Sequence, residues 1–155
     1  MSSNNSDYEH LLFYFAYKTF INTADEIIEQ YGLSRQHHRF LFFIDKVPGI
    51  TIKNLLKSLE ISKQGSHATL RKLKEEGLIV EKQAVDDKRV KQLYVTEQGQ
   101  QLVRTLNKAQ NDLFQQIQQD VGHDWYAIME AFAERRPGFR EVKHLKHMQA
   151  HQNND

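Results

Sequence analysis

The chain contains no cysteine among its 155 residues. Disulfide bonds, thiolate nucleophiles, cysteine-ligated zinc and thiol-based redox sensing are therefore excluded. Residues 11–17 are apolar or aromatic, but Lys18 ends this run well short of the roughly 20 residues that a membrane-spanning helix needs. The opening MSSNNSDYEH is polar and does not resemble a secretory signal, so we expect a cytoplasmic protein.

The chain also lacks an excess of charge of one sign. Lys and Arg number 21 against 20 Asp and Glu, a net charge of +1, so any affinity for nucleic acid must come from local patches. No glycine-rich phosphate-binding loop and no Ser-His-Asp arrangement is present. Asp86 and Asp87 are adjacent carboxylates, but an exposed loop would not split their pKa values. We therefore expect no enzymatic activity and no cofactor.

What the chain does have is a series of helical patterns. The first covers residues 8–31 and ends at Gly32. Its segment LLFYFAY is apolar around the whole helix, which implies burial on more than one side. We favour contact with a second subunit over burial within one chain. A second helix, residues 35–47, has the apolar centre FLFFI and ends at Pro48-Gly49.

Two short helices follow in a helix-turn-helix arrangement. Thr51 begins the first, whose apolar stripe includes Leu55, Leu56 and Leu59. Ser62 is expected to cap the second, which ends at Gly77. One face of this second helix is polar and mostly basic, although an ordinary solvated face would look the same in isolation. Its members are Lys63, Gln64, His67, Arg71 and Lys74.

The next segment reads as a β-hairpin, with strands at 78–83 and 90–95 around the loop AVDDKR. The pairs Leu78/Val80 and Leu93/Val95 are expected on its buried side. Residues 62–91 hold eight Lys or Arg and five Asp or Glu, a local charge of +3 against −2 elsewhere. Helix-turn-helix followed by hairpin is a winged helix-turn-helix. This order favours a helix in the major groove of DNA and a wing at the backbone or minor groove.

The C-terminal part is again helical. Thr96 begins a long helix to about residue 120 with a narrow apolar seam, which is typical of helix–helix association. Gly122 separates it from a helix at about 123–134. The tail, residues 135–155, is expected to be partly helical. His144, His147 and His151 share a spacing that could gather a metal ion, but the polar, fraying tail makes a metal site unexpected.

Three segments resemble the MarR family of bacterial transcription regulators. LSRQHHRFLFFI at 33–44 matches its second helix, residues 50–83 match its helix-turn-helix and first wing strand, and DDKRVKQLYVTEQG at 86–99 matches its wing signature. The resemblance covers about residues 8–134. It implies a homodimer with interlocked N- and C-terminal helices and two lobes that read a pseudo-palindrome in double-stranded DNA. In many members it also implies a pocket for a small-molecule effector.

Three groups of candidate residues result. Carried over from the family, the DNA contacts are Ser62, Lys63, Gln64, Ser66, His67, Arg71, Lys88, Arg89 and Lys91. Asp87 would brace Arg89 through a bidentate pair. The candidate effector pocket comprises Tyr14, Tyr17, His37, His38 and Arg39. The candidate dimer interface comprises Leu11, Leu12, Phe15, Leu113, Ile117 and Trp125.

The predicted fold is mainly α (α+β), a winged helix-turn-helix with a dimerisation region formed by the N- and C-terminal helices. Residues 1–32 form the N-terminal dimerisation helix, 33–99 the winged lobe, 100–134 the C-terminal dimerisation helices and 135–155 the tail. The alternative function is a winged-helix module for protein–protein assembly. Such a module would not need the basic stripe or Arg89.

Overall fold

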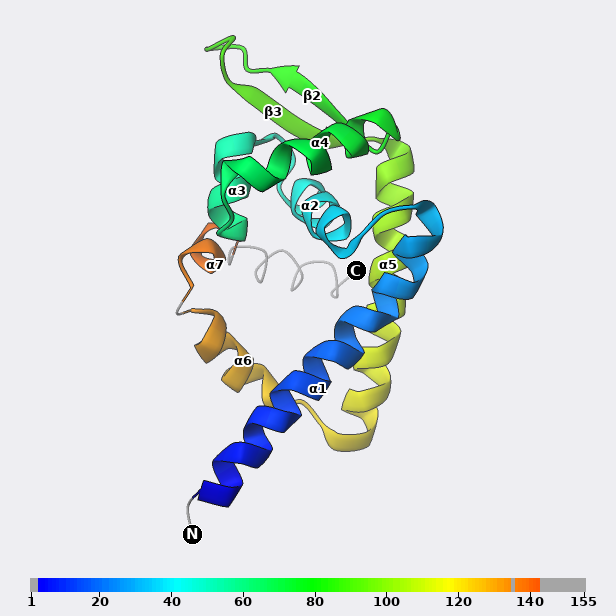
Figure 1. Cartoon of the computed structure of the whole chain (residues 1–155), viewed down its shortest axis with the longest axis vertical. Helices are drawn as coiled ribbons and strands as arrows, with labels where there is room; N and C mark the ends of the chain where they lie inside the picture. The colour runs from blue at the N-terminus through cyan, green and yellow to red at the C-terminus, as the bar shows by residue number, and fades with distance from the viewer. Residues whose placement is uncertain (1–2, 135, 143–155) are drawn as a thin grey trace, which may run out of the picture.

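Two long helices carry a winged lobe in the computed structural model, which describes residues 3–134 and 136–142 (Figure 1). Helices α1 and α5 pack against each other below, and the lobe lies above them. The predicted class, mainly helical with a small sheet, is confirmed. The helices are α1 Ser3–Ile28, α2 Arg35–Lys46, α3 Ile52–Leu59, α4 Ser66–Glu75, α5 Glu97–Val121, α6 Trp125–Ala133 and α7 Pro137–Val142, with 3-10 turns η1 Glu29–Tyr31 and η2 Lys63–Gly65.

The sheet has three antiparallel strands in the order β1-β3-β2. β2 (Ile79–Gln83) and β3 (Lys91–Val95) form the predicted hairpin, with Ile79 opposite Val95 and Gln83 opposite Lys91. β1 is only Ile50–Thr51, too short to leave a pattern in the sequence.

The predicted alternation is wrong on β2 by one residue. Ile79 is buried, whereas Val80 is exposed. Leu78 is buried too, but it precedes the strand, and its N–H bonds to the carbonyl of Leu73 at the end of α4. Leu78 therefore does not indicate which side of the sheet is buried. Its direction is set by the turn at Gly77, with φ +73°, that ends α4.

The core lies within the lobe and its junction with the long helices. Side chains from α1, α2, α3, α4, β3 and α5 meet there, and Phe40, Leu41 and Ile44 from the centre of α2 are fully buried. The N-terminal half of α1 lies outside this core. The largest fully buried side chains include Ile28, Phe40, Leu41, Ile44, Leu55, Leu73, Leu93 and Leu106.

Thr51 and Thr96 cap the helices that they begin. Thr51 Oγ1 accepts a hydrogen bond from the N–H of Asn54, and Thr96 Oγ1 accepts one from the N–H of Gly99, each at 3.1 Å. Ser62 makes no such bond. The 3-10 turn η2 follows it, and α4 begins only at Ser66, whose hydroxyl donates to the carbonyl of Lys63 at 2.7 Å. A serine that occupies this carbonyl competes with regular helix formation, which explains why the expected start at Ser62 is wrong.

The C-terminal segment contains the short helix α7, with Pro137 as its first residue, a favoured place for proline. His144, His147 and His151 lie outside the described residues. Within the described ranges, no three His, Asp or Glu side chains are grouped so as to hold a metal ion. Nor does any described helix combine the length and apolarity needed to cross a membrane.

Candidate functional site

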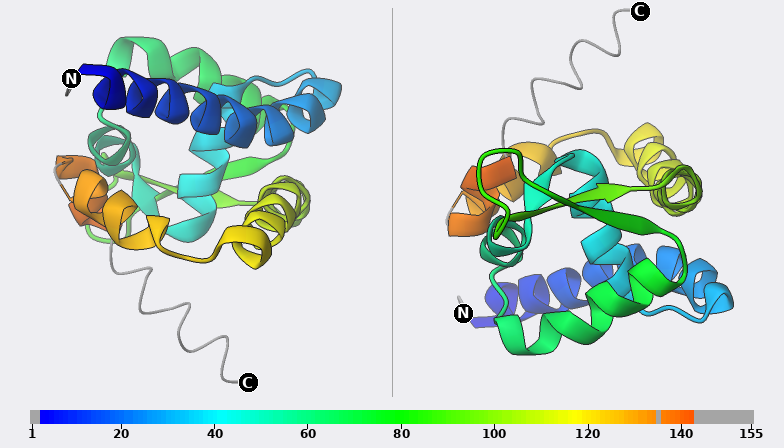
Figure 2. Two further views of the ribbon diagram at one scale, coloured as in Figure 1. Left: turned by 90° about the horizontal axis from the view of Figure 1, so that it is seen from below. Right: turned by 90° about the horizontal axis from the view of Figure 1, so that it is seen from above.

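Helix α4 presents its predicted polar stripe to solvent at the outer end of the lobe. Leu70 and Leu73 face the core, while the stripe residues on the opposite face are exposed. The β2–β3 hairpin lies at the same end of the molecule, and the view from above shows both elements toward the viewer (Figure 2). The exposed residues of the stripe are Lys63, Gln64, His67, Arg71 and Lys74.

Ser66 does not belong to this surface. Its side chain is completely buried, and its hydroxyl is used by the carbonyl of Lys63. The expectation that Ser66 contacts DNA is therefore wrong, because the late start of α4 turns this residue toward the core. Ser62 is exposed but caps nothing with its side chain.

At the tip of the hairpin, Arg89 and Asp87 form a two-pronged ion pair. Arg89 Nε lies 3.2 Å from Asp87 Oδ1, and Nη2 lies 3.3 Å from Oδ2. The N–H of Arg89 also donates to Oδ1 at 3.0 Å. These bonds, the side-chain ones first, lower the pKa of the Asp87 carboxyl. The Arg89 side chain is 91% exposed, so the pair contributes little to stability and acts mainly on orientation.

Glu81 on β2 links the hairpin to α4. Its Oε2 lies 3.4 Å from Nζ of Lys74 and 3.7 Å from Nζ of Lys91. The sequence analysis missed this residue, because nothing local marks a strand carboxylate that reaches two lysines from different elements. Lys63, Arg71 and Lys88 have no ion-pair partner among the described residues, so these three cations remain available to an anionic partner.

The first turn of α2 contacts the start of the helix-turn-helix's second helix. Gln36 Nε2 donates to the carbonyl of Gly65 at 3.2 Å. His37 Nδ1 accepts the N–H of Ser34 at 3.0 Å and lies 2.9 Å from its hydroxyl, which makes a capping box. Burial lowers the pKa of His37, and the charge of Lys72 adds to this effect. His37 is therefore a capping residue and does not line the predicted pocket.

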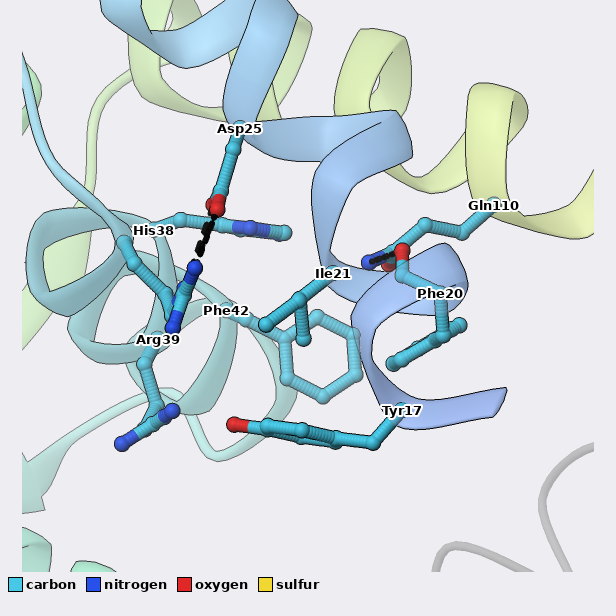
Figure 3. Close-up of a pocket in the computed structure, with 9 residues that line it drawn as sticks. Tyr17, Phe20, Ile21, Asp25, His38, Arg39, Phe42 and Gln110 are labelled. Atoms are coloured by element: carbon cyan, nitrogen blue, oxygen red, sulfur yellow. Dashed lines mark hydrogen bonds and ion pairs between the residues drawn. The ribbon is translucent and has the colours of Figure 1, made fainter. Parts of the chain in front are cut away.

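A pocket of about 260 Å³ lies where α1, α2 and α5 meet (Figure 3). Of the five predicted residues, Tyr17, His38 and Arg39 line it. Tyr14 does not, and instead contacts Phe15 and Lys18 further along α1. Helical spacing along α1 and α2 could have revealed all but one of the residues that were missed, since Gln110 lies on α5. The missed residues are Phe20, Ile21, Asp25, Arg35, Phe42 and Gln110.

The pocket combines aromatic walls with one paired and one unpaired arginine. Arg35 Nη2 lies 2.6 Å from Asp25 Oδ2. The dashed line at Asp25 in Figure 3 marks this ion pair. No carboxylate among the described residues pairs with Arg39. Burial lowers the pKa of His38, against an opposing effect of Asp25 and with a smaller contribution from Arg39. The rim therefore carries an uncompensated positive charge.

A band of large apolar side chains on α1 lies uncovered. Leu11, Leu12 and Phe15 are 54%, 50% and 60% exposed. On α5, Ile117 is 44% exposed, whereas Leu113 is half-buried. Trp125 is half-buried too, because it stacks on Phe114 with ring centroids 5.2 Å apart. Single scattered apolar residues are normal on a protein surface, whereas a contiguous exposed band such as this one is not.

A helix-turn-helix followed by an antiparallel hairpin defines the winged helix-turn-helix class of proteins. Within that class, a MarR-family profile matches residues 31–90, which make up most of the winged lobe. The resemblance seen in the sequence is thereby confirmed.

One relative is the HTH-type transcriptional regulator PetP of Rhodobacter capsulatus, which is 38% identical over 97 residues. These residues make up 63% of this chain and 58% of PetP, so the match spans less than two thirds of that protein's length. The chain is thus a homologue of a transcriptional regulator.

Solved structures agree with this fold. MarR superposes with a TM-score of 0.62 at 21% identity, over 80% of this chain and 90% of MarR. S. aureus MepR in its DNA complex superposes with a TM-score of 0.64 at 20% identity, over 81% of this chain and 93% of MepR. At these identities the likeness establishes the fold and not the residues of the site.

Proposed function

We propose that this protein is a homodimeric, sequence-specific regulator of transcription that binds double-stranded DNA. The observation that carries the proposal is the placement of two features at one end of the lobe. Helix α4, whose basic face is exposed, and the β2–β3 hairpin, which carries the braced Arg89, lie together at the end of the molecule opposite the N-terminus of α1. PetP supports this proposal by its name, and MepR by its DNA-bound structure.

In the proposed complex, α4 lies in the major groove. Gln64 and His67 are exposed on its first turns, where the N-terminal part of a recognition helix meets base edges, and glutamine pairs well with adenine. Lys63 and Arg71, which have no ion-pair partner among the described residues, contact phosphates. Phosphate contacts fix the register of the protein but carry no sequence information.

The wing contacts the DNA beside α4. Asp87 holds the Arg89 guanidinium and aims it at the backbone or minor groove, and a positioned arginine loses less side-chain freedom on binding than a free one. Lys88 and Lys91 add attraction that does not depend on sequence. The alternative, a winged-helix module for protein–protein assembly, is not favoured, because such a module would not need these exposed cations.

The exposed apolar band on α1 supports the homodimer. We propose that Leu11, Leu12 and Phe15 pack against the partner, together with Leu113, Ile117 and Trp125 from the C-terminal helices. Two lobes related by a two-fold axis would read an inverted repeat with half-site centres about 34–36 Å apart, one turn of DNA. Residues 1–32 and 100–134 then form the dimerisation regions, and residues 33–99 form the reading lobe.

The pocket beside Arg39 supports an effector as a second element of function. Its aromatic walls fit a flat apolar body, and the uncompensated Arg39 fits a negatively charged group. Arg39 and Gln36 lie in the same first turns of α2, and Gln36 bonds to the start of the recognition element. A small anionic aromatic ligand at this place would therefore act close to a contact that positions α4.

Footprinting of the purified protein on genomic DNA tests the regulator proposal. We expect a small set of protected sites that share an inverted repeat. A lack of protected sites even at low salt, where electrostatic binding is strongest, would overturn the proposal. The genes beside the sites would indicate the chemistry of the effector.

A further inference from the structure

The C-terminal segment returns from the long helices to the winged lobe. Helix α6 leads away from α5, and α7 then packs against α3, the first helix of the helix-turn-helix. Figure 1 places α7 on the side of α3 away from the hairpin, and the views from below and above both show the two helices side by side (Figure 2). Residues 137–142 therefore contact the reading lobe without lying on its proposed DNA surface.

The contact between α7 and α3 is a close backbone approach. Gly138 is buried, and a Cβ at this position would overlap the carbonyl oxygen of Ser58 and lie 2.9 Å from the carbonyl carbon. No side chain fits at that distance, so glycine is required at position 138 for α7 to pack this closely against α3. Ser58 is itself buried, with 7% of its surface exposed.

An ion pair fixes the same segment to the turn of the helix-turn-helix. Arg136 Nε donates to Glu60 Oε2 at 2.8 Å. Glu60 is the one non-glycine residue with positive φ, +56°, among the described residues. Its N–H bonds to the carbonyl of Lys57, and the N–H of Ile61 bonds to that of Leu56, which closes α3. Arg136 thus holds a residue whose unusual backbone sets the path from α3 into η2 and α4.

We infer that the segment from Arg136 to Val142 is a brace that positions the recognition helix. Arg136 and Gly138 are positioning residues: they act through Glu60 and Ser58 and do not touch DNA. The inference rests on the proposed function for its effect on DNA binding, but the bracing itself concerns the free protein. Since α7 is joined to α5 through α6, the brace also connects the reading lobe to the C-terminal dimerisation helices.

The test compares four full-length proteins: wild type, Arg136→Glu, Glu60→Arg and the double variant that swaps both charges. Two quantities are measured, the affinity for a duplex carrying the footprinted site and the amide hydrogen exchange of residues 57–70 in the free protein. Each single variant places like charges together. We expect an affinity loss on the order of threefold to tenfold, in keeping with a partly exposed pair, and faster exchange. The double variant should recover both.

Arg104→Glu is the matched control, because it makes the same change of charge at an exposed site on α5. It should leave the exchange of residues 57–70 unchanged. Gly138→Val should have a larger effect than Arg136→Glu, and the charge variants keep the test decisive if Gly138→Val does not fold.

Wild-type exchange in Arg136→Glu, or a double variant that recovers neither quantity, would overturn the inference. A wild type that binds no DNA would overturn the regulator proposal instead. The exchange data alone would then decide whether α7 braces the turn.

Discussion

The hydroxyl of Thr96 donates a hydrogen bond to the carbonyl of Gly77 at 2.6 Å. Gly77 terminates α4, and Thr96 lies between β3 and α5. The same hydroxyl accepts the N–H of Gly99, and the N–H of Thr96 donates to the carbonyl of Leu78. The Thr96 side chain therefore links the end of α4 to the start of α5, although the hairpin separates these two helices in the sequence.

Replacing Thr96 tests this link. Thr96→Val keeps the shape but removes both hydroxyl bonds, and we expect a loss of roughly 1–2 kcal/mol in the free energy of unfolding, as for other lost helix caps. Thr96→Ser keeps the hydroxyl and should cost much less. Urea unfolding measures both. A small loss in Thr96→Val together with a larger loss in Thr96→Ser would show that the methyl group, not the hydroxyl, matters.

Two glycines should respond oppositely to alanine. A Cβ on Gly99 would overlap the carbonyl oxygen of Leu78 and lie 3.1 Å from its carbon, so Gly99→Ala should destabilise by roughly 1–3 kcal/mol, as overpacking does. Gly65 has φ −86° and open space around its Cβ position. Gly65→Ala should therefore be neutral or stabilising by up to about 1 kcal/mol. Chemical denaturation of both variants measures this contrast, and a stable Gly99→Ala would refute the close contact.

Charged residues in the apolar band should separate the subunits. Leu12 and Phe15 are exposed on α1, and burying a carboxylate without a partner is strongly unfavourable. Leu12→Glu combined with Phe15→Glu should give a monomer by light scattering. Gln30→Glu is the control and should stay dimeric, because Gln30 is an exposed residue of η1 outside the apolar band. A dimeric double variant would place the interface elsewhere.

Stability should fall as the solution becomes mildly acidic. The pKa of His38 is lowered below its ordinary 6.5, mainly by burial, so the unfolded chain takes up a proton more readily. The stabilising effect is complete above about pH 6.5 and is lost as the pH falls toward the folded-state pKa. Unfolding curves at several pH values, with His38→Gln for comparison, should show a shallower pH dependence in the variant. A wild type that gains stability on acidification would contradict this assignment.

The winged lobe could be predicted from the sequence because each signal there is local. Helical periodicity and caps at Thr51 and Thr96 are read over a few residues, and the Asp87–Arg89 pair spans only two positions. The misplaced residues depend on less local effects. Ser66 turns inward because a 3-10 turn delays α4, and His37 is engaged by the cap at Ser34.

The relationships that the sequence did not indicate join distant parts of the chain. Glu81 reaches lysines on α4 and β3, the pocket brings Asp25 to Arg35, and Arg136 meets Glu60 across 76 positions. Neither partner of such a pair is unusual in its own segment. Only the packing of helices and strands on one another determines which charges become neighbours.

The salt dependence of duplex binding tests the central claim most directly. If α4 and the wing bind DNA through Lys63, Arg71, Lys88 and Arg89, the logarithm of the affinity should fall steeply and linearly with the logarithm of salt concentration, by about 0.9 per phosphate neutralised. Arg89→Ala should weaken binding and make that slope shallower by about 1 for each contact removed. Binding that is absent at low salt, or an Arg89→Ala variant with wild-type affinity and slope, would contradict the account.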